Sequence, residues 1–431
     1  MAENAAALAF RRKIFSNFAP KLMIMAEAIN LHTLSNGLRV VHIASTSRVA
    51  YCGIAVNTGS RDEMAGKQGL AHFVEHTIFK GTKRRRSWHI INRMERVGGE
   101  LNAYTTKEET VVYSIFPSEH FSRAAELIAD LVENSQFPAN ELIKEREVVL
   151  DEVNSYLDSP SEAIYDDYED LIWKGSSLGH NILGNEADLM TISSEDCRRH
   201  LDHLYVPENM VLFALGPMRS DTVMRTAEKF FGCMKNPLLR QERKAPDTVP
   251  QFHEIRPIDA HQSHTIYGAP LFSMFDKRKY AMLLLNNILG GPGMNSLLNV
   301  AIRERRGYAY TVEASLALLS DCGLLTIYFG SDNEHVRPSL RIIERTIDRL
   351  ASTPLSARSL DAAKKQYIGQ LQVASDSHEA QALSAAKSLL YFGRVGSNEE
   401  TAARISAVTS ADIMDMAALI SADKASILTM E

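Results

Sequence analysis

Residues 69–79, GLAHFVEHTIF, carry two histidines and a glutamate within an apolar run. The spacing of the apolar residues predicts a helix that ends near Gly81. Each residue of a helix advances by about 100°, so the side chains of His72, Glu75 and His76 share one face. Polar groups of this kind are costly to bury unless they bind something. The stretch therefore predicts a helix with a chemical role.

Two histidines four residues apart on a helix can bind one metal ion. Glu75 lies beside them; it can reach a water molecule on that ion but cannot easily bind the ion itself. This arrangement suits metal-assisted hydrolysis, in which the ion lowers the pKa of the water and the carboxylate takes its proton. The short HxxEH pattern also arises by chance, so a site of this kind needs further ligands.

A catalytic zinc needs a third protein ligand and an open fourth position. The candidate stretch is ANELIKEREVVLDEVNSYL, residues 139–157, which reads as a helix. Glu145 and Glu152 are seven residues apart, so they lie on one face of that helix, within about 20° of each other. Either can complete the site. Taken alone, an acidic helix face is more often simply solvated.

The composition limits the classes of partner. The chain has 431 residues, enough for about two or three domains of ordinary size. Its 47 basic and 53 acidic side chains give a net charge of −6, and we expect no nucleic-acid partner. Four cysteines without CxxC spacing fit a reducing compartment. No apolar run approaches the roughly 20 residues that span a bilayer, so we expect no membrane partner.

Residues 1–28 have an unusual composition. The part before Met23 and Met25 contains several basic residues but only one acidic residue. They can be an Arg-containing amphipathic transit peptide or an extension upstream of a later start. Low serine and modest arginine content favour the extension. We therefore expect a cytoplasmic protein, with the mitochondrial matrix as the alternative.

A single plan of elements occurs twice along the chain. Strand, helix, strands and helices follow one another from about residue 29, and the order repeats after a charged stretch with three prolines. We expect hairpins at residues 31–45 and 100–116, and helices at residues 118–135, 139–157, 161–172 and 193–204. The predicted organisation is an N-terminal extension (residues 1–28), a first domain (29–234), a linker (235–256) and a second domain (257–431).

Two other clusters look like weaker sites. The stretch CRRHLDH places Cys197, His200 and His203 three residues apart, a spacing that drifts around a helix, and we expect an ordinary surface helix. The acidic run at residues 164–173 can favour basic peptides, but a solvated helix face is the simpler expectation.

The motif HFVEH at residues 72–76 resembles the inverted zinc motif of the pitrilysin family of zinc endopeptidases, in its mitochondrial-processing-peptidase-like branch. In that family the third ligand is a glutamate 76 residues beyond the second histidine, and Glu152 stands there. A further family glutamate, seven residues earlier, matches Glu145. The resemblance implies one zinc per chain on His72, His76 and Glu152, with Glu75 as general base and Glu145 orienting His76.

Two further blocks support the resemblance. GGELNAYTTKEET, residues 98–110, is similar to the family's edge strand, and implies that Asn102, Ala103 and Tyr104 bind an extended substrate. AIRERRGYAYTV, residues 301–312, is similar to the family's Arg/Tyr block. It implies that Arg303 and Tyr310 clamp the substrate carbonyl and stabilise the oxyanion.

The resemblance covers nearly the whole chain from about residue 29 and implies an α+β fold. Two similar domains are expected, each a mainly antiparallel sheet with helices packed on one side, with zinc in the first and the Arg/Tyr pair in the second. It implies an endopeptidase that hydrolyses peptides or unfolded segments in a closed chamber, as a homodimer in which Arg303 and Tyr310 can act in trans. The alternative is a non-catalytic, core-type assembly subunit of the same fold. Such subunits lack the ligands that this chain keeps.

Overall fold

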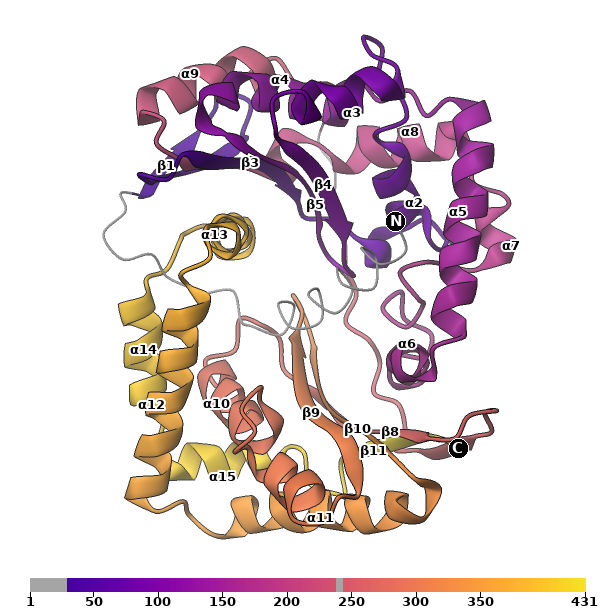
Figure 1. Cartoon of the computed structure of the whole chain (residues 1–431), viewed down its shortest axis with the longest axis vertical. Helices are drawn as coiled ribbons and strands as arrows, with labels where there is room; N and C mark the ends of the chain where they lie inside the picture. The colour runs from indigo at the N-terminus through magenta and orange to yellow at the C-terminus, as the bar shows by residue number, and fades with distance from the viewer. Residues whose placement is uncertain (1–28, 238–242) are drawn as a thin grey trace.

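The computed structural model describes residues 29–237 and 243–431, and its two halves stack along the long axis of the molecule (Figure 1). Each half contains one sheet and its own set of helices. Residues 1–28, for which an extension or transit peptide was expected, lie outside the described residues. Within the described residues, no helix is both long enough and apolar enough to cross a membrane.

The first sheet has six strands in the order β1-β2-β6-β3-β5-β4. All neighbours are antiparallel except β2 and β6, so the expected mainly antiparallel sheet is confirmed. The two predicted hairpins are the antiparallel pairs β1–β2 and β4–β5, and β4 is an edge strand. The strands are β1 (Ile29–Thr33), β2 (Arg39–Ala44), β3 (Val49–Val56), β4 (Glu100–Thr105), β5 (Thr110–Pro117) and β6 (Met210–Gly216).

Helices of the first half cover one face of this sheet and enclose an apolar core. Strand residues alternate between the two faces: Val40 belongs to this core, whereas Val41 and Ile43 belong to a cluster on the opposite face. The helices are α2 (Leu70–Thr77), α3 (Ser87–Glu95), α4 (Phe121–Asn134), α5 (Ala139–Leu157), α6 (Pro160–Ile172), α7 (Glu186–Leu189), α8 (Ser194–Leu204) and α9 (Ser220–Phe231), with 3₁₀ turns η1 (Ser60–Asp62), η2 (Ser118–His120) and η3 (Pro207–Asn209).

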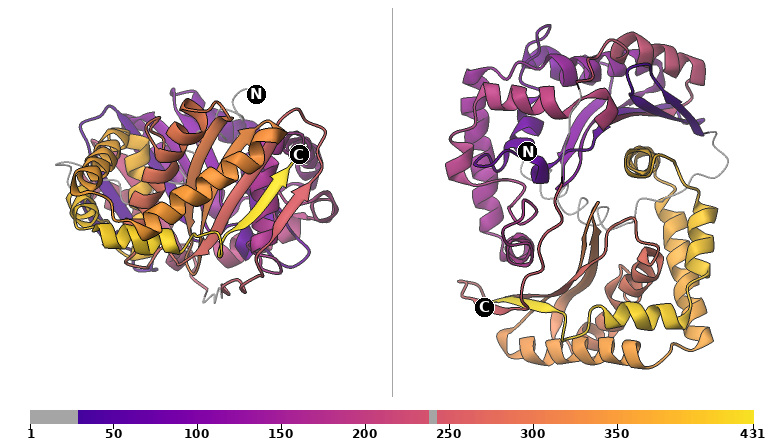
Figure 2. Two further views of the ribbon diagram at one scale, coloured as in Figure 1. Left: turned by 90° about the horizontal axis from the view of Figure 1, so that it is seen from below. Right: turned by 180° about the vertical axis from the view of Figure 1, so that it is seen from behind.

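The second sheet has five strands in the order β7-β11-β8-β10-β9, with β9 as an edge strand. The strands are β7 (His253–Arg256), β8 (Ser263–Leu271), β9 (Ala309–Leu318), β10 (Gly323–Ser331) and β11 (Ser426–Met430). The view from below shows α11 (Asn333–Ser352) crossing the outer side of this sheet (Figure 2). The other helices are α10 (Lys279–Gly290), α12 (Ala357–Ala374), α13 (His378–Phe392), α14 (Asn398–Ser406) and α15 (Ser410–Ala418).

The structure differs from the sequence expectation at the end of the linker, residues 235–256. Its last four residues form β7, which pairs in parallel with β11 near the C-terminus. That pairing joins segments about 170 residues apart in the chain, so the local composition of the linker does not reveal it.

The second helix of the second half also differs from a regular α-helix. Asn299–Glu304 form a π-helix, η4, in which the Arg305 N–H donates to the Val300 carbonyl. Gly307 follows with φ +63°, a left-handed conformation that favours glycine and ends the helix before β9.

Each half also lends one helix to the other half. Helix α6 of the first half packs on β8 and β11, and helix α13 of the second half packs on β2, β3 and β6 (Figure 1). Two apolar clusters lie at these contacts; one includes Tyr168 and Leu428, and the other includes Phe213 and Leu389. Each sheet therefore has its own helices on one face and one helix from the other half on the opposite face. The expectation of helices on one side of each sheet is therefore correct only for the helices that belong to the same half as the sheet.

Candidate metal centre

Helix α2 starts at a glycine that the local geometry requires. Gly69 has φ +89°, and a Cβ atom there would lie 2.6 Å from the Leu183 carbonyl oxygen. The buried carboxylate of Glu63 accepts hydrogen bonds from the N–H groups of Gly69 (2.9 Å) and Ala71 (2.8 Å). These contacts satisfy two donors at the helix N-terminus and hold the helix in place. Glu63 was not identified from the sequence, because it precedes the helix by several residues and matches no local capping pattern.

The structure brings together His72, His76 and Glu152, as the resemblance implied. Helices α2 and α5 pack against each other, and the Glu152 Oε2 atom lies 3.8 Å from His72 Nε2 and 3.5 Å from His76 Nε2. The three ligand atoms are all within 4.8 Å of one another. Within residues 29–237 and 243–431, no other cluster of histidine, cysteine, aspartate or glutamate has this property.

These separations fit a zinc ion. Zinc bonds of about 2.1 Å in tetrahedral geometry place neighbouring ligand atoms about 3.4 Å apart. The 3.5 and 3.8 Å separations need only small movements to reach that arrangement. Two imidazoles and one carboxylate are also a donor set of catalytic zinc sites, because they leave a fourth position for water. His72 is buried, whereas Glu152 is about one-third exposed, so one side of the site faces solvent.

Glu145 lies on the other side of the His76 ring. His76 Nδ1 donates a hydrogen bond to Glu145 Oε1 at 3.0 Å, and the second oxygen of Glu145 pairs with Lys80. Burial alone would raise the pKa of Glu145, but His76 and Lys80 lower it below its ordinary value. When His76 is neutral, a carboxylate in this position keeps the proton on Nδ1, so that Nε2, which faces Glu152, has the lone pair that can bind a metal ion.

The same contacts control the charge of His76 in the absence of metal. Burial alone would lower its pKa, but the hydrogen bonds to Glu145 and Glu152 and the charge of Glu75 raise the pKa to about 9. Glu75 is buried, with 6% of its surface exposed, on the same helix as both histidines. A metal ion must therefore displace a proton from His76.

The three residues expected to bind substrate lie on the edge strand β4. Asn102, Ala103 and Tyr104 are all half-buried, and α2 packs against this strand. Ala103 contacts the core on the α2 side, whereas Tyr104 contacts the cluster on the α13 side. The strand is therefore adjacent to the helix that carries the two histidines.

Arg303 and Tyr310 lie on η4 and β9 of the second half. Tyr310 is 71% exposed, and 44% of the Arg303 side chain is exposed, with Glu304 3.9 Å from its Nε atom. Both side chains are therefore accessible to another molecule.

The weaker sequence clusters have different environments from those expected. Cys197 and His200 face the core and are buried, so the expectation of a surface helix was wrong for these two residues, while His203 is exposed. Burial lowers the pKa of His200 to about 4. The acidic run is only partly a solvated face, because three of its acids bind other segments; the pairs are Asp166 with Tyr156, Asp167 with Arg256 and Glu169 with Lys107.

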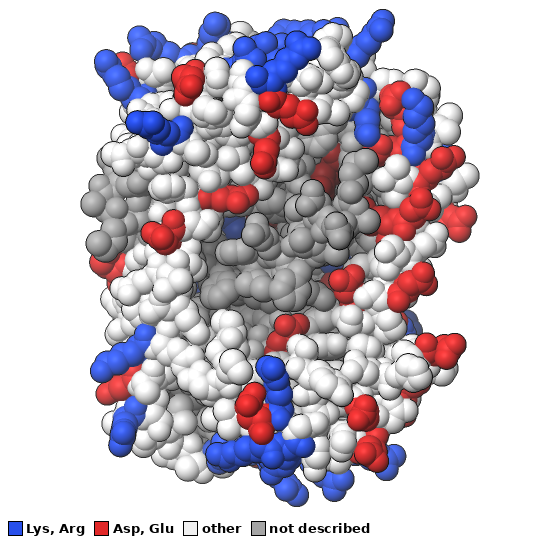
Figure 3. Space-filling view, in the orientation of Figure 1, with Lys and Arg blue, Asp and Glu red and all other residues white. Residues whose placement is uncertain are grey.

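A cavity of about 460 Å³ lies beside the ligand helix and was not predicted. Its wall includes Asn154 of α5, three aspartates of α6 (Asp166, Asp167 and Asp170) and His180. Figure 3 shows acidic side chains gathered on the side of the molecule that α5, α6 and α7 form. Residues of α5, of α6 and of the loop before α7 line the cavity, so it forms only when these segments pack together.

Two family models match this chain. One, described as "Insulinase (Peptidase family M16)", matches residues 39–186, and the other, "Peptidase M16 inactive domain", matches residues 191–367. The chain is 31% identical over 387 residues to "Uncharacterized zinc protease YmxG" of Bacillus subtilis, covering 88% of this chain and 92% of that protein. It is also 31% identical over 402 residues to an "Uncharacterized zinc protease" of Rickettsia bellii, with 91% and 95% covered.

Solved structures share the two-domain α+β fold. "The crystal structure of a protease from Helicobacter pylori" aligns with a TM-score of 0.88 at 20% identity, over 94% of this chain and 99% of that chain. A peptidase M16 inactive domain from Pseudomonas fluorescens aligns with a TM-score of 0.86 at 16% identity, over 94% and 97%.

Proposed function

Because this chain belongs to the insulinase-type peptidase family M16, we propose that it is a zinc-dependent endopeptidase. Its substrates are peptides or unfolded segments, hydrolysed in a closed chamber. The observation that carries the proposal is the convergence of His72, His76 and Glu152 from two helices. These residues would hold one zinc ion per chain, and the bound ion would supply a Lewis acid that polarises the peptide carbonyl and acidifies a water molecule.

Glu75 is the general base in this proposal. Its buried carboxylate lies on the same helix as the two histidines, one residue before His76, and its charge contributes to the raised pKa of His76. It takes a proton from the attacking water and returns it to the leaving amine. Glu145 acts through its hydrogen bond to His76 and keeps that ring in one tautomer.

The substrate binds by strand addition along β4. An extended peptide added to a sheet edge forms main-chain hydrogen bonds that depend on its shape more than on its side chains. In this arrangement Asn102 holds the peptide backbone near the scissile bond, Ala103 contributes main-chain bonds and Tyr104 contributes the adjacent surface. Because α2 packs on β4, a peptide on this edge lies beside the metal centre.

Arg303 and Tyr310 complete the site as donors to the oxyanion. Removing one donor of this type typically costs about 3–4 kcal/mol of transition-state stabilisation. Both side chains are exposed on the second half, which supports a homodimer in which they act on the partner's metal centre.

The acidic cavity gives a preference for basic side chains in this proposal. Asp166, Asp167 and Asp170 place three carboxylates in its wall, next to the helix that carries Glu152. Tyr156 and Arg256 already contact the first two, so a substrate cation would share or replace those contacts. A guanidinium or ammonium group of the substrate would gain charge-assisted hydrogen bonds there. Peptides with arginine or lysine near the cleaved bond are therefore the expected better substrates.

The alternative is a non-catalytic, core-type assembly subunit of the same fold. That reading gives no reason for two histidines and a glutamate to converge at 3.5 and 3.8 Å beside a buried glutamate. The family model for the second half carries the description "inactive domain", and the metal-binding cluster lies entirely in the first half. In this proposal the first half holds the metal and the general base, and the second half contributes only Arg303 and Tyr310.

The test combines metal analysis with a peptide digest. Purified protein is analysed for zinc by mass spectrometry and incubated with a peptide mixture, and the cut sites are identified. About one zinc per chain is expected, with cleavage that a chelator abolishes and added zinc restores. Protein that binds no zinc and cleaves no peptide would contradict the proposal and favour the assembly alternative.

A further inference from the structure

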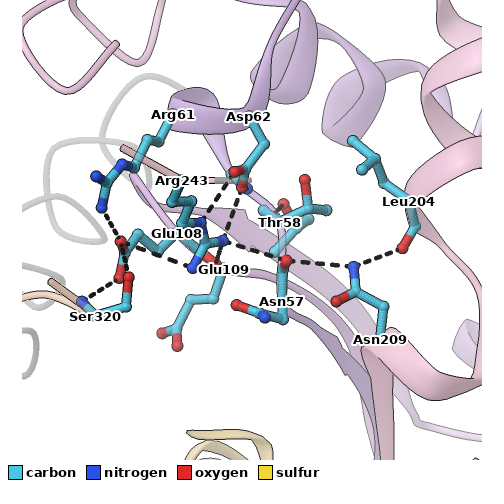
Figure 4. Close-up of polar contacts among 12 residues, drawn as sticks. Asn57, Thr58, Arg61, Asp62, Glu108, Glu109, Leu204, Asn209, Arg243 and Ser320 are labelled. Atoms are coloured by element: carbon cyan, nitrogen blue, oxygen red, sulfur yellow. Dashed lines mark hydrogen bonds and ion pairs between the residues drawn. The ribbon is translucent and has the colours of Figure 1, made fainter. Parts of the chain in front are cut away.

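A buried set of charges joins the two halves where two hairpins meet. The turn between β4 and β5, residues 106–109, contacts the turn between β9 and β10, residues 319–322. The carboxylate of Glu108 is 2% exposed and accepts hydrogen bonds from the Ser320 N–H (2.8 Å) and from the Ser320 hydroxyl (2.7 Å) (Figure 4). A carboxylate of the first half thus binds both the backbone N–H and the hydroxyl of one residue in the second half.

Arg61 links the same two turns. Arg61 is 3% exposed, and its guanidinium pairs with Glu108 on one side and with both carboxylate oxygens of Asp321 on the other. It also donates to the Lys244 carbonyl at 2.8 Å. We call these four residues, Arg61, Glu108, Ser320 and Asp321, the hairpin latch.

Two further segments close around the hairpin latch. Arg243, from the connection between the halves, pairs with Asp62 at 2.8 Å and donates to the Glu108 carbonyl at 3.0 Å. Tyr391 of α13 donates to the same carbonyl at 3.2 Å, and Lys387 of α13 pairs with Glu109 at 2.6 Å. The turn after β4 therefore contacts three segments: the turn between β9 and β10, the connection between the two halves, and α13.

Buried charges of this kind fix relative position more strongly than apolar contacts do. The clusters under α6 and α13 are apolar, and apolar contacts are non-directional. A charge-assisted hydrogen bond in a low-dielectric interior is directional, and a displaced partner leaves a costly unpaired charge. The hairpin latch therefore selects one relative placement of the two hairpins.

That placement affects the strand proposed to bind substrate. Strand β4 is the edge of the first sheet, β9 is the edge of the second sheet, and the hairpin latch holds their turns together. Asn102 lies six residues before Glu108 on the same hairpin, and Tyr310 lies on β9, ten residues before Ser320. A shift between the turns would move the two edge strands relative to each other.

We propose that Glu108 is a positioning residue for the substrate: through Ser320 and Arg61 it holds β4 in the alignment that an extended peptide needs. This inference rests on the proposed peptidase function and adds a role for the contact between the halves. Glu108 does not touch the reacting atoms in this proposal. Its loss weakens binding of extended peptides and leaves the chemical step largely intact.

The main test compares three purified, zinc-loaded variants of the full chain. Glu108→Gln keeps an acceptor for Ser320 but removes the charge that binds Arg61, and Asp321→Asn is a milder change on the other half. Asp130→Asn is the matched control, because Asp130 is equally buried and pairs with Arg85, but within the first half alone. For an extended peptide we expect the two latch variants to raise KM about 5–10-fold with kcat within about twofold, and the control to change neither.

A double variant tests whether the contact acts as one unit. Glu108→Gln combined with Ser320→Ala should raise KM no further than the larger single effect, because both changes break the same contact. KM effects that multiply, or an unchanged KM in folded Glu108→Gln and Asp321→Asn, would overturn the proposal. An equal rise of KM in Asp130→Asn would overturn it too.

Hydrogen exchange separates this inference from the proposed function. Amides of residues 100–117 should exchange faster in Glu108→Gln and at the wild-type rate in Asp130→Asn. If the wild-type protein cleaves no peptide, the proposed function fails, and exchange alone decides whether Glu108 holds the hairpin. Unchanged exchange in Glu108→Gln would contradict the hairpin latch itself.

Discussion

Glu145 Oε1 lies 3.0 Å from Nδ1 of His76, while Glu152 Oε2 lies 3.5 Å from Nε2 of the same ring. One helix, α5, thus supplies both carboxylates, seven residues apart, and each faces a different nitrogen of one histidine. Glu145 orients the ring through Nδ1, and Nε2, the atom proposed to bind the metal ion, faces Glu152. This division of roles gives distinct expectations for the two glutamates.

Glu145→Gln should weaken zinc binding without abolishing it. The amide can still accept the hydrogen bond from His76 Nδ1, but it lacks the charge that raises the basicity of the ring. Loss of an outer partner of this kind typically costs about 10–100-fold in metal affinity. Competition with a fluorescent zinc chelator measures the change. Glu147→Gln, an exposed glutamate on the same helix, is the control and should bind zinc like the wild type.

Zinc affinity should rise with pH up to about 9. The pKa of His76 is raised to about 9 in the metal-free protein, so the ring is protonated below that pH and must lose a proton to bind zinc. Apparent affinity should fall about tenfold per pH unit below the pKa for this one proton. Calorimetric titrations from pH 6 to pH 9 in buffers of different ionisation enthalpy measure both the affinity and the proton release. Affinity that is independent of pH would contradict a protonated His76.

Glu75→Gln should retain zinc and lose peptide cleavage. The three ligand atoms belong to other residues, so metal content should stay at the wild-type level. Loss of a general base typically lowers kcat by about 10²–10⁴-fold. Glu95→Gln, an exposed glutamate on the neighbouring helix α3, should have wild-type activity. Normal cleavage by Glu75→Gln would exclude the proposed mechanism.

Mixing two inactive variants tests whether Arg303 acts across a dimer. Glu75→Gln lacks the base, and Arg303→Ala lacks the exposed donor on η4. If Arg303 serves the partner's metal centre, re-associated mixtures contain hybrid dimers with one intact site and recover about a quarter of wild-type activity. No recovery in mixtures shown to contain hybrid dimers would place Arg303 in the same chain as the metal it serves.

His200 should make the protein sensitive to acid. Burial lowers its pKa to about 4, against about 6.5 in the unfolded chain. Its contribution to the free energy of unfolding is therefore fully present above pH 6.5 and is lost as the pH falls through 4. The loss is on the order of 3 kcal/mol. His200→Gln should show a smaller difference between urea midpoints at pH 7 and pH 4.5, whereas His203→Gln, on the exposed face, should behave like the wild type.

Local sequence predicted the elements well because their signals are short-range. The hairpin predicted at residues 31–45 is confirmed as β1 and β2, and Asn36-Gly37 lie in the turn between them. Helical spacing placed His72, Glu75 and His76 on one face, and this requires only the geometry of a single helix. The residues alone left Glu145 and Glu152 as alternative ligands. The structure separates them, because only the packing of α5 against α2 decides which carboxylate reaches both Nε2 atoms.

The contacts between the two halves could be learned only from the folded structure. An amphipathic helix such as α6 or α13 carries an apolar face, but its sequence does not specify which sheet it covers, and each helix covers the sheet of the other half. The contact of Glu108 with Ser320 joins residues 212 positions apart. The elements, the repeated plan and the shared face of His72, Glu75 and His76 could be predicted from the sequence, since they follow from neighbouring residues. The cross-packed helices α6 and α13, the hairpin latch and the acidic cavity could not be predicted. Each depends on apolar or charged contacts between segments that are distant in the chain.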